Sequence, residues 1–230
     1  SKTPLTHVVL NDWNHAFSSK ESALAARFSD EFYRAFHFAK EKDKGYTQIN
    51  NLETVNQKSS WTRIANKIDL IKIDLEKVIL PNDSLIITLD YVIKLPNARF
   101  TKFGFNKDEQ WIMKYILLTP ALFTKGEFTL QSNENLDDIA NALMDYDVQF
   151  TFPYNKVVSS NLTFKNVQLS DKGETFSFSG KNKNEVTFLL TNKEEVRTSK
   201  FNAVELVTTL NKVKIDKEDQ LRIEEKIIGF

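Results

Sequence analysis

Between Tyr46 and about Leu210, apolar residues recur with a period of two, and this pattern constrains the fold more than any other feature of the sequence. Such alternation is typical of strands that bury one face. Polar turns separate the segments at intervals of roughly 8–15 residues, which favours a mainly β fold, an antiparallel β-sandwich. Eighteen Phe residues suit two sheets that face each other through aromatic side chains. The predicted strands span 7–10, 68–75, 85–93, 111–118, 148–152, 157–164, 175–179, 185–191 and 204–210.

A stretch before this region has helical periodicity instead. Its large apolar side chains recur every four residues, at Leu24, Phe28, Phe32 and Phe36. Ser19 or Ser22 can cap the start, and Gly45 is a natural stop after a charged run. We therefore predict an amphipathic helix over 20–43.

The last twenty residues return to helical spacing. Apolar residues interleaved with charges predict a second helix over about 217–228. We divide the chain into a β-sandwich domain at 1–210, with the helix 20–43 inserted, and a linker or the start of a following domain at 211–230. Because the second helix is still amphipathic where the sequence stops, we expect the chain to be part of a longer protein.

Composition excludes several classes of protein. Thirty-one Lys and Arg balance thirty-one Asp and Glu, so we expect no nucleic acid partner, which would require a basic surplus. The absence of cysteine excludes disulfides, thiolate metal sites and Cys nucleophiles. No apolar run approaches the ~20 residues of a membrane span, and the first residues do not form a secretory signal.

The sequence offers little catalytic chemistry. Its histidines, His7, His15 and His37, form no His-Glu-x-x-His motif, and no Gly-x-Ser-x-Gly or glycine-rich phosphate loop occurs. A metal held by Asp12, His15 and His37 is an alternative that matches no common spacing, so we favour ordinary hydrogen-bonded histidines. We therefore predict no catalytic, cofactor-binding or metal-binding residue in this chain. Carboxylate pairs occur in three places, where we favour solvated turns and faces over Ca²⁺ binding or catalysis: Asp137-Asp138, Asp145 with Asp147, and Glu194-Glu195.

The order of several short segments nevertheless resembles the N-terminal β domain of M1-family (gluzincin) aminopeptidase-like proteins, in the form seen in Bacteroidetes-type bacteria. The likeness covers most of residues 5–210. The segments that carry it are Asn11-Asp12-Trp13-Asn14-His15-Ala16-Phe17, Leu24-Ala25-Ala26-Arg27-Phe28, Gly45-Tyr46-Thr47, Pro81-Asn82-Asp83-Ser84, Leu85-Ile86-Ile87-Thr88, Tyr115-Ile116-Leu117-Leu118-Thr119-Pro120-Ala121, Asn135-Leu136-Asp137-Asp138 and Tyr146-Asp147-Val148-Gln149-Phe150-Thr151-Phe152-Pro153.

The resemblance implies a saddle-shaped sandwich that packs against a thermolysin-like catalytic domain outside this chain. That domain would hold the zinc ion, and the whole protein would act on peptides. In the family, a Gln and a Glu on one strand of the β domain hold the α-amine of the peptide. Matched to Leu117-Leu118-Thr119-Pro120, Leu117 replaces the Gln and Thr119 the Glu, and neither gives an anionic contact. Thr119 is left as a candidate for lining the cleft between the domains.

Three functions are compatible with the sequence. The first is an ancillary domain of a zinc metallopeptidase-like protein, inert alone, whose parent carries a His-Glu-x-x-His within roughly a hundred residues after Phe230. The second is a non-enzymatic β-sandwich that binds a protein or carbohydrate, where Trp13, Trp61 or Trp111 can stack on a sugar. The third is a free-standing enzyme with a carboxylate site. From the resemblance we expect an exported or membrane-associated bacterial protein.

Overall fold

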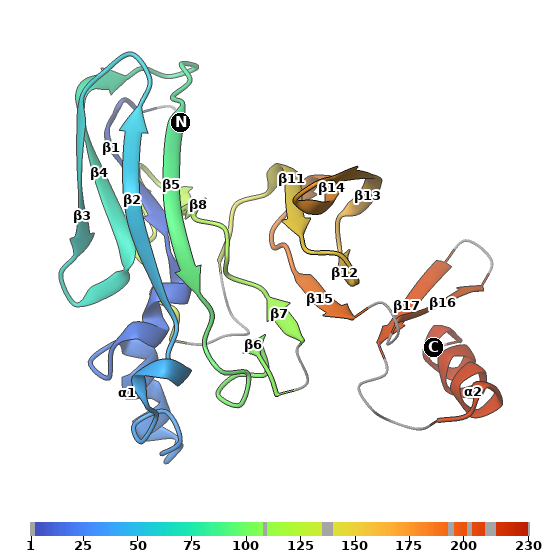
Figure 1. Cartoon of the computed structure of the whole chain (residues 1–230). Helices are drawn as coiled ribbons and strands as arrows, with labels where there is room; N and C mark the ends of the chain where they lie inside the picture. Colours follow the sequence, from blue (N-terminus) through green and yellow to red (C-terminus); the bar gives the residue numbers. More distant parts are fainter. Residues whose placement is uncertain are drawn as a thin grey trace.

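A computed structural model of the chain describes residues 3–107, 110–134, 140–192, 196–201, 204–209 and 215–229. The protein is mainly β, its strand ladders are antiparallel, and its sheets do not close into a barrel (Figure 1). The predicted fold class is thus confirmed. In the described ranges, no helix is long and apolar enough to cross a membrane.

The first half of the chain builds one sandwich. Its larger sheet has the order β3-β4-β1-β8, and β2 pairs with β5 in the facing layer. Apolar side chains fill the space between the layers, among them Leu10 and Ile73 from the larger sheet and Leu52 from β2. The strands are β1 (Leu5–Asn11), β2 (Tyr46–Thr54), β3 (Ser59–Ile64), β4 (Lys67–Ile79), β5 (Ile87–Lys94) and β8 (Thr119–Pro120).

An aromatic cluster closes one end of this sandwich, where the short helices lie in Figure 1. The fully buried ring of Phe17 makes edge-on contacts with Phe36 and Phe103, at centroid distances of 6.3 and 5.4 Å. Edge-to-face contacts of this kind add to the free energy gained from burying the rings. The helices that carry or flank the cluster are η1 (Trp13–Ser18), α1 (Ala23–Asp30) and η2 (Glu41–Asp43).

The helix predicted over 20–43 is wrong in length, because α1 ends at Asp30. Phe32 takes a left-handed φ of 57°, and the amides of Phe32 and Tyr33 donate to the carbonyls of Ser29 and Phe28. This is the Schellman pattern, which normally has glycine at the left-handed position. Ser22 caps the start, as predicted, by accepting a hydrogen bond from the Ala25 amide at 3.1 Å.

Gly45 does not stop a helix either. A Cβ at this position would lie 2.8 Å from Pro96 Cδ and 3.0 Å from the carbonyl oxygen of Lys94. Gly45 therefore permits two backbone segments to approach closely. On the sequence alone, this glycine was considered only as a stop signal for a helix.

The second half of the chain builds another sandwich. One sheet has the order β11-β14-β13, and the other has the order β12-β15-β7-β6. Their inner faces meet through aromatic rings, as expected, with Phe150 of one sheet 4.5 Å from Phe188 of the other. The strands are β6 (Gly104–Phe105), β7 (Trp111–Met113), β11 (Met144–Phe152), β12 (Lys156–Ser160), β13 (Thr163–Ser170), β14 (Gly173–Lys183) and β15 (Phe188–Asn192); a small hairpin, β9 (Phe123–Thr124) with β10 (Glu127–Phe128), precedes β11.

Two strand predictions differ from the structure in more than the positions of their ends. Residues 111–118 are strand only over β7, because the chain then crosses from the second sandwich to the first. Residues 157–164 are two strands, β12 and β13, separated by a bend at Asn161 and Leu162. The Asn161 side chain accepts a hydrogen bond from the Thr187 amide at 3.0 Å, which fixes the bend.

A hairpin and the last helix form a small unit at the right of Figure 1. The hairpin consists of β16 (Val196–Phe201) and β17 (Val204–Thr209), and the helix is α2 (Lys217–Ile228), as predicted. Glu224 of α2 accepts hydrogen bonds from Ser199 at 2.5 Å and from Thr208 at 2.7 Å, which attach the helix to the hairpin. The proposed division of the chain at residue 210 stays a prediction.

Candidate functional site

Thr119 lies where the two sandwiches adjoin. It belongs to β8, which pairs with the end of β1 through Asn11, and only 8% of its surface is exposed. The segment before it, 114–118, comes directly from β7 of the second sandwich. Thr119 therefore has the first sandwich on one side and side chains of the second on the other.

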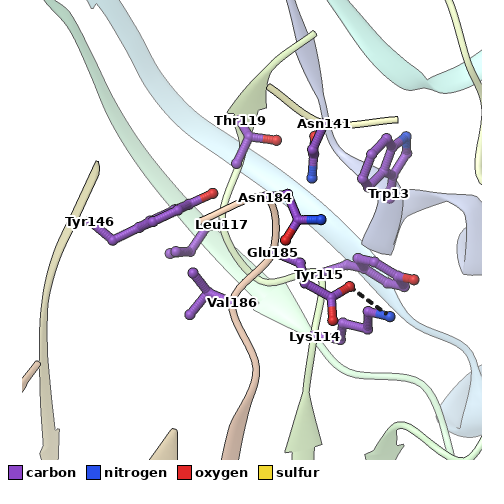
Figure 2. Close-up of a pocket in the computed structure, with 10 residues that line it drawn as sticks. All are labelled: Trp13, Lys114, Tyr115, Leu117, Thr119, Asn141, Tyr146, Asn184, Glu185 and Val186. Atoms are coloured by element: carbon purple, nitrogen blue, oxygen red, sulfur yellow. Dashed lines mark ion pairs between the residues drawn. The ribbon is translucent and has the colours of Figure 1, made fainter. Parts of the chain in front are cut away.

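A narrow pocket surrounds this position (Figure 2). Thr119 and Asn141 lie at one end, the ion pair of Lys114 and Glu185 lies at the other, and Trp13 and Tyr146 stand on opposite sides. The enclosed volume is about 40 Å³, which holds a water molecule or the tip of a side chain and no larger ligand.

A wider recess adjoins the narrow pocket and shares Leu117, Thr119 and Tyr146 with it. Its volume is about 490 Å³, within the range of small-molecule sites. Tyr91 and Asp145 add polar groups to a mainly apolar wall. Leu117 and Thr119, the two residues singled out on the sequence, thus both line the same cleft. That this cleft faces a second domain stays a prediction.

The carboxylates of this cleft come from the second sandwich; on the sequence, Asp145 was assigned to a solvated pair with Asp147, and Glu185 was not singled out. Glu185 forms an ion pair with Lys114 at 3.0 Å, and Asp145 accepts a hydrogen bond from the Asn182 amide at 3.0 Å. Leu117 and Thr119 supply no negative charge, as the sequence indicates. An ammonium group entering the cleft would instead meet Asp145 or Glu185, which no local sequence signal connects to residues 117–119.

The polar side chains of the cleft are suited to forming hydrogen bonds with a ligand. The Asn141 side chain accepts a hydrogen bond from Asn11 at 3.3 Å, and the Trp13 indole donates to the Gln131 carbonyl at 3.1 Å. Burial raises the pKa of Tyr146 and that of Tyr91, so both phenols stay protonated and can donate. The cleft thus presents hydrogen-bonding groups held in place by neighbouring elements.

A buried polar network supports the Trp13 side of the cleft. The Asp12 carboxylate accepts from the Thr47 hydroxyl at 2.6 Å and from Arg63 at 2.8 Å. Burial raises the pKa of Asp12 to about 6, although the Arg63 charge opposes the shift. Burial, together with the Arg63 charge, lowers the pKa of His15 to about 4, and its Nδ1 accepts from the Thr47 amide at 3.1 Å.

A second buried carboxylate continues the network. Asp69 accepts a hydrogen bond from the Ser132 hydroxyl at 2.8 Å and from the Asn133 amide at 2.6 Å. The Asn133 side chain donates in turn to the carbonyl of Trp13 at 3.1 Å. The network therefore joins β1, β2, β3 and β4 to the segment that positions the indole in the cleft wall.

The histidines do not converge on a metal. His37 Nε2 lies 2.8 Å from the Ser29 hydroxyl, and His15 is bound within the network of Asp12 and Thr47. Within the described ranges, no three His, Asp or Glu side chains are grouped so that they can hold a metal ion. Of the carboxylate pairs, Asp145 and Asp147 lie exposed on β11, whereas Asp137-Asp138 and Glu194-Glu195 lie outside the described residues.

No known protein family and no curated protein matches the sequence. Solved structures do match the fold. An M1 zinc metallopeptidase mutant from Deinococcus radiodurans bound to a Tyr-Ser-Ala substrate is 11% identical, with a TM-score of 0.50 over 97% of this chain and 45% of that chain. The unmutated enzyme from the same organism, also 11% identical, gives 0.48 over the same shares, and a two-domain M1 zinc metallopeptidase mutant bound to L-tryptophan, 12% identical, gives 0.48 over 96% and 44%.

This chain therefore shares its fold with part of an M1 zinc metallopeptidase, as the resemblance of the sequence implies. It spans about 45% of the length of the solved structure that it matches with a TM-score of 0.50.

Proposed function

We propose that this chain is the ancillary N-terminal β domain of a zinc metallopeptidase-like protein, and that it shapes the substrate cleft and braces a catalytic domain outside the chain. The observation that carries the proposal is the shared fold over nearly the whole chain and less than half of the solved M1 structure. The cleft around Thr119 is the part of the surface that we assign to substrate contact, because it joins a recess of ligand size to fixed polar groups.

The zinc ion belongs to the catalytic domain in this proposal. The described residues of this chain do not fit a zinc site, since zinc needs three or four His, Cys or carboxylate ligands at bonding distance and no such group is formed. In this proposal, the chain contributes to the reaction by binding and positioning a peptide.

Comparing the complete product of the gene with this chain alone tests the proposal. We expect the complete product to hydrolyse aminoacyl amides or short peptides and this chain alone to be inactive. A coding region that stops soon after Phe230, without a His-Glu-x-x-His, would contradict the proposal.

The role of Thr119 is tested in the complete product. Thr119→Val keeps the side-chain volume and removes the hydroxyl, so KM for a peptide should rise roughly threefold, the value of one neutral hydrogen bond, with kcat little changed. Thr124→Val, at an exposed position of β9, is the matched control. Equal KM values for both variants would remove Thr119 from the substrate cleft.

A second candidate function is a non-enzymatic module that binds a protein or carbohydrate. Its specific support is the exposure of Phe32 (85%) and Phe38 (80%), two large aromatic side chains near each other in sequence. Both rings line the same recess, and contiguous exposed apolar surface often marks an interaction site. A pull-down with the Phe32→Ser and Phe38→Ser variants tests this alternative, which fails if no captured partner depends on either ring.

A further inference from the structure

A second cavity lies beyond Lys114 and Tyr115, outside the cleft around Thr119. Its volume is about 700 Å³, larger than the recess of about 490 Å³ beside Thr119. Its wall comes from Tyr33, from the turn at residues 99–103 and from residues of the β7 segment, including Ile112. A cavity of this size accommodates a small organic molecule.

The charged residues that line this cavity are all cations. Arg99, Lys102 and Lys114 line it, and no described lining residue carries a carboxylate. Arg99 pairs with Asp43 at 3.3 Å and Lys114 with Glu185 at 3.0 Å. Lys102 is exposed, and no described acid lies within ion-pair distance of it. Among the described residues, the cavity thus has one cation without an acidic partner, Lys102, beside two cations that are paired with acids.

Aromatic rings hold two of these cations in place. The Arg99 guanidinium carbon lies 5.0 Å from the centroid of the Phe100 ring, and the Lys114 ammonium lies 5.5 Å from that of Tyr115. Cations over ring faces are attracted by the ring quadrupole and lose mobility. The Tyr33 hydroxyl also donates to the Arg99 carbonyl at 2.6 Å, which fixes the turn that carries the cations.

Part of the wall of this cavity is apolar. Phe100 and Phe103, which are almost fully buried, and Ile112 belong to this part of the wall.

We propose that this cavity binds a small organic anion in which a carboxylate or phosphate is attached to an apolar ring. The anionic group contacts Lys102 and the neighbouring cations, and the ring rests against Phe103 and Ile112. The site goes beyond the proposed function, because binding here needs neither a catalytic domain nor a peptide.

Isothermal titration calorimetry of the full chain tests this site with four probes. Phenyl phosphate and benzoate carry both features, benzyl alcohol has the ring without the charge, and inorganic phosphate has the charge without the ring. We expect at least one ring-bearing anion to bind with one-to-one stoichiometry, roughly fivefold or more tightly than either single-feature probe. Phenyl phosphate and benzoate together distinguish a phosphate ligand from a carboxylate ligand.

A matched pair of variants locates the site. Lys102 and Lys125 are both exposed and both adopt a left-handed backbone, with φ of 66° and 53°, which Asn tolerates well. Lys102→Asn should weaken binding of the tighter anion roughly fivefold, and Lys125→Asn, outside the cavity, should leave it unchanged. The Ile112 methyl resonance should shift on binding. Absence of anion binding, equal binding of benzyl alcohol, or equal affinity of the two variants would overturn the proposal.

Discussion

The guanidinium of Arg63 on β3 lies 2.8 Å from the carboxylate of Asp12, whose side chain is fully buried. Arg63 also donates to the carbonyl of Ile68 at 2.6 Å and to that of Thr47 at 3.3 Å. One side chain therefore connects β4 and β2 to the segment that carries Trp13 into the cleft wall.

Removing Arg63 should destabilise the fold strongly. Arg63→Met leaves the buried Asp12 carboxylate without its cation, which costs about 3–5 kcal/mol in the free energy of unfolding. The double variant Arg63→Met, Asp12→Asn should lose less than the single variant, because no uncompensated charge remains. Urea denaturation of the three proteins measures both effects. A loss below about 1 kcal/mol for Arg63→Met would mean that the pair is not structural.

Asp12 and His15 should give the stability opposite dependences on pH. The pKa of Asp12 is raised to about 6 on folding, so its contribution weakens the fold as the pH rises from about 4 to 6. The pKa of His15 is lowered to about 4, so its contribution weakens the fold as the pH falls from about 6.5 to 4. In the unmodified protein the two contributions largely cancel.

Two variants separate these contributions. Asp12→Asn leaves His15 to act alone, so stability should rise more steeply between pH 4 and 6.5 than in the unmodified protein. His15→Asn should shift the slope in the other direction. Thermal unfolding at several pH values checks this, and slopes that change in the same direction in both variants would refute it.

Phe32 is expected to be a source of strain. Its left-handed φ of 57° is unfavourable for a bulky residue, and its side chain is 85% exposed. Phe32→Gly should raise the free energy of unfolding by about 1 kcal/mol. Phe38→Gly, equally exposed and without a left-handed backbone, should be neutral or destabilising. If both glycine variants lose stability to the same extent, Phe32 is not strained.

Gly45 should tolerate no side chain. A Cβ would lie 2.8 Å from Pro96 Cδ and 2.9 Å from its backbone nitrogen, and the rigid proline cannot move aside easily. Gly45→Ala should therefore lower the free energy of unfolding by about 1–3 kcal/mol, the usual cost of overpacking. Chemical denaturation measures the loss. A neutral result would show that the two segments separate without cost.

Local signals predicted the parts of the fold that depend on local contacts. The bounds of α2 agree with the prediction because Asp216 caps the helix, accepting a hydrogen bond from the Asp219 amide at 2.8 Å. The strand pattern likewise identified a mainly β protein, since strands such as β5 and β11 pack alternate residues into a core cluster. These features need no knowledge of the rest of the chain.

Features that depend on tertiary contacts were not predictable in the same way. The periodicity of Phe28, Phe32 and Phe36 favoured one long helix, but Phe32 adopts a turn conformation that a sequence normally marks with glycine. The cleft carboxylates Asp145 and Glu185 are more than twenty residues from Thr119 and meet it only through packing of the two sandwiches. The spacing of residues in a sequence motif cannot indicate a contact that forms only when the two sandwiches pack together.

Zinc content is the measurement that tests the central claim most directly. Both the complete gene product and this chain alone are to be purified, dialysed and analysed for bound metal by plasma mass spectrometry. The account predicts about one zinc per complete molecule and none in this chain, in keeping with a catalytic zinc held by a separate domain. Stoichiometric zinc in this chain, or its absence from a complete product that is fully folded, would contradict the account.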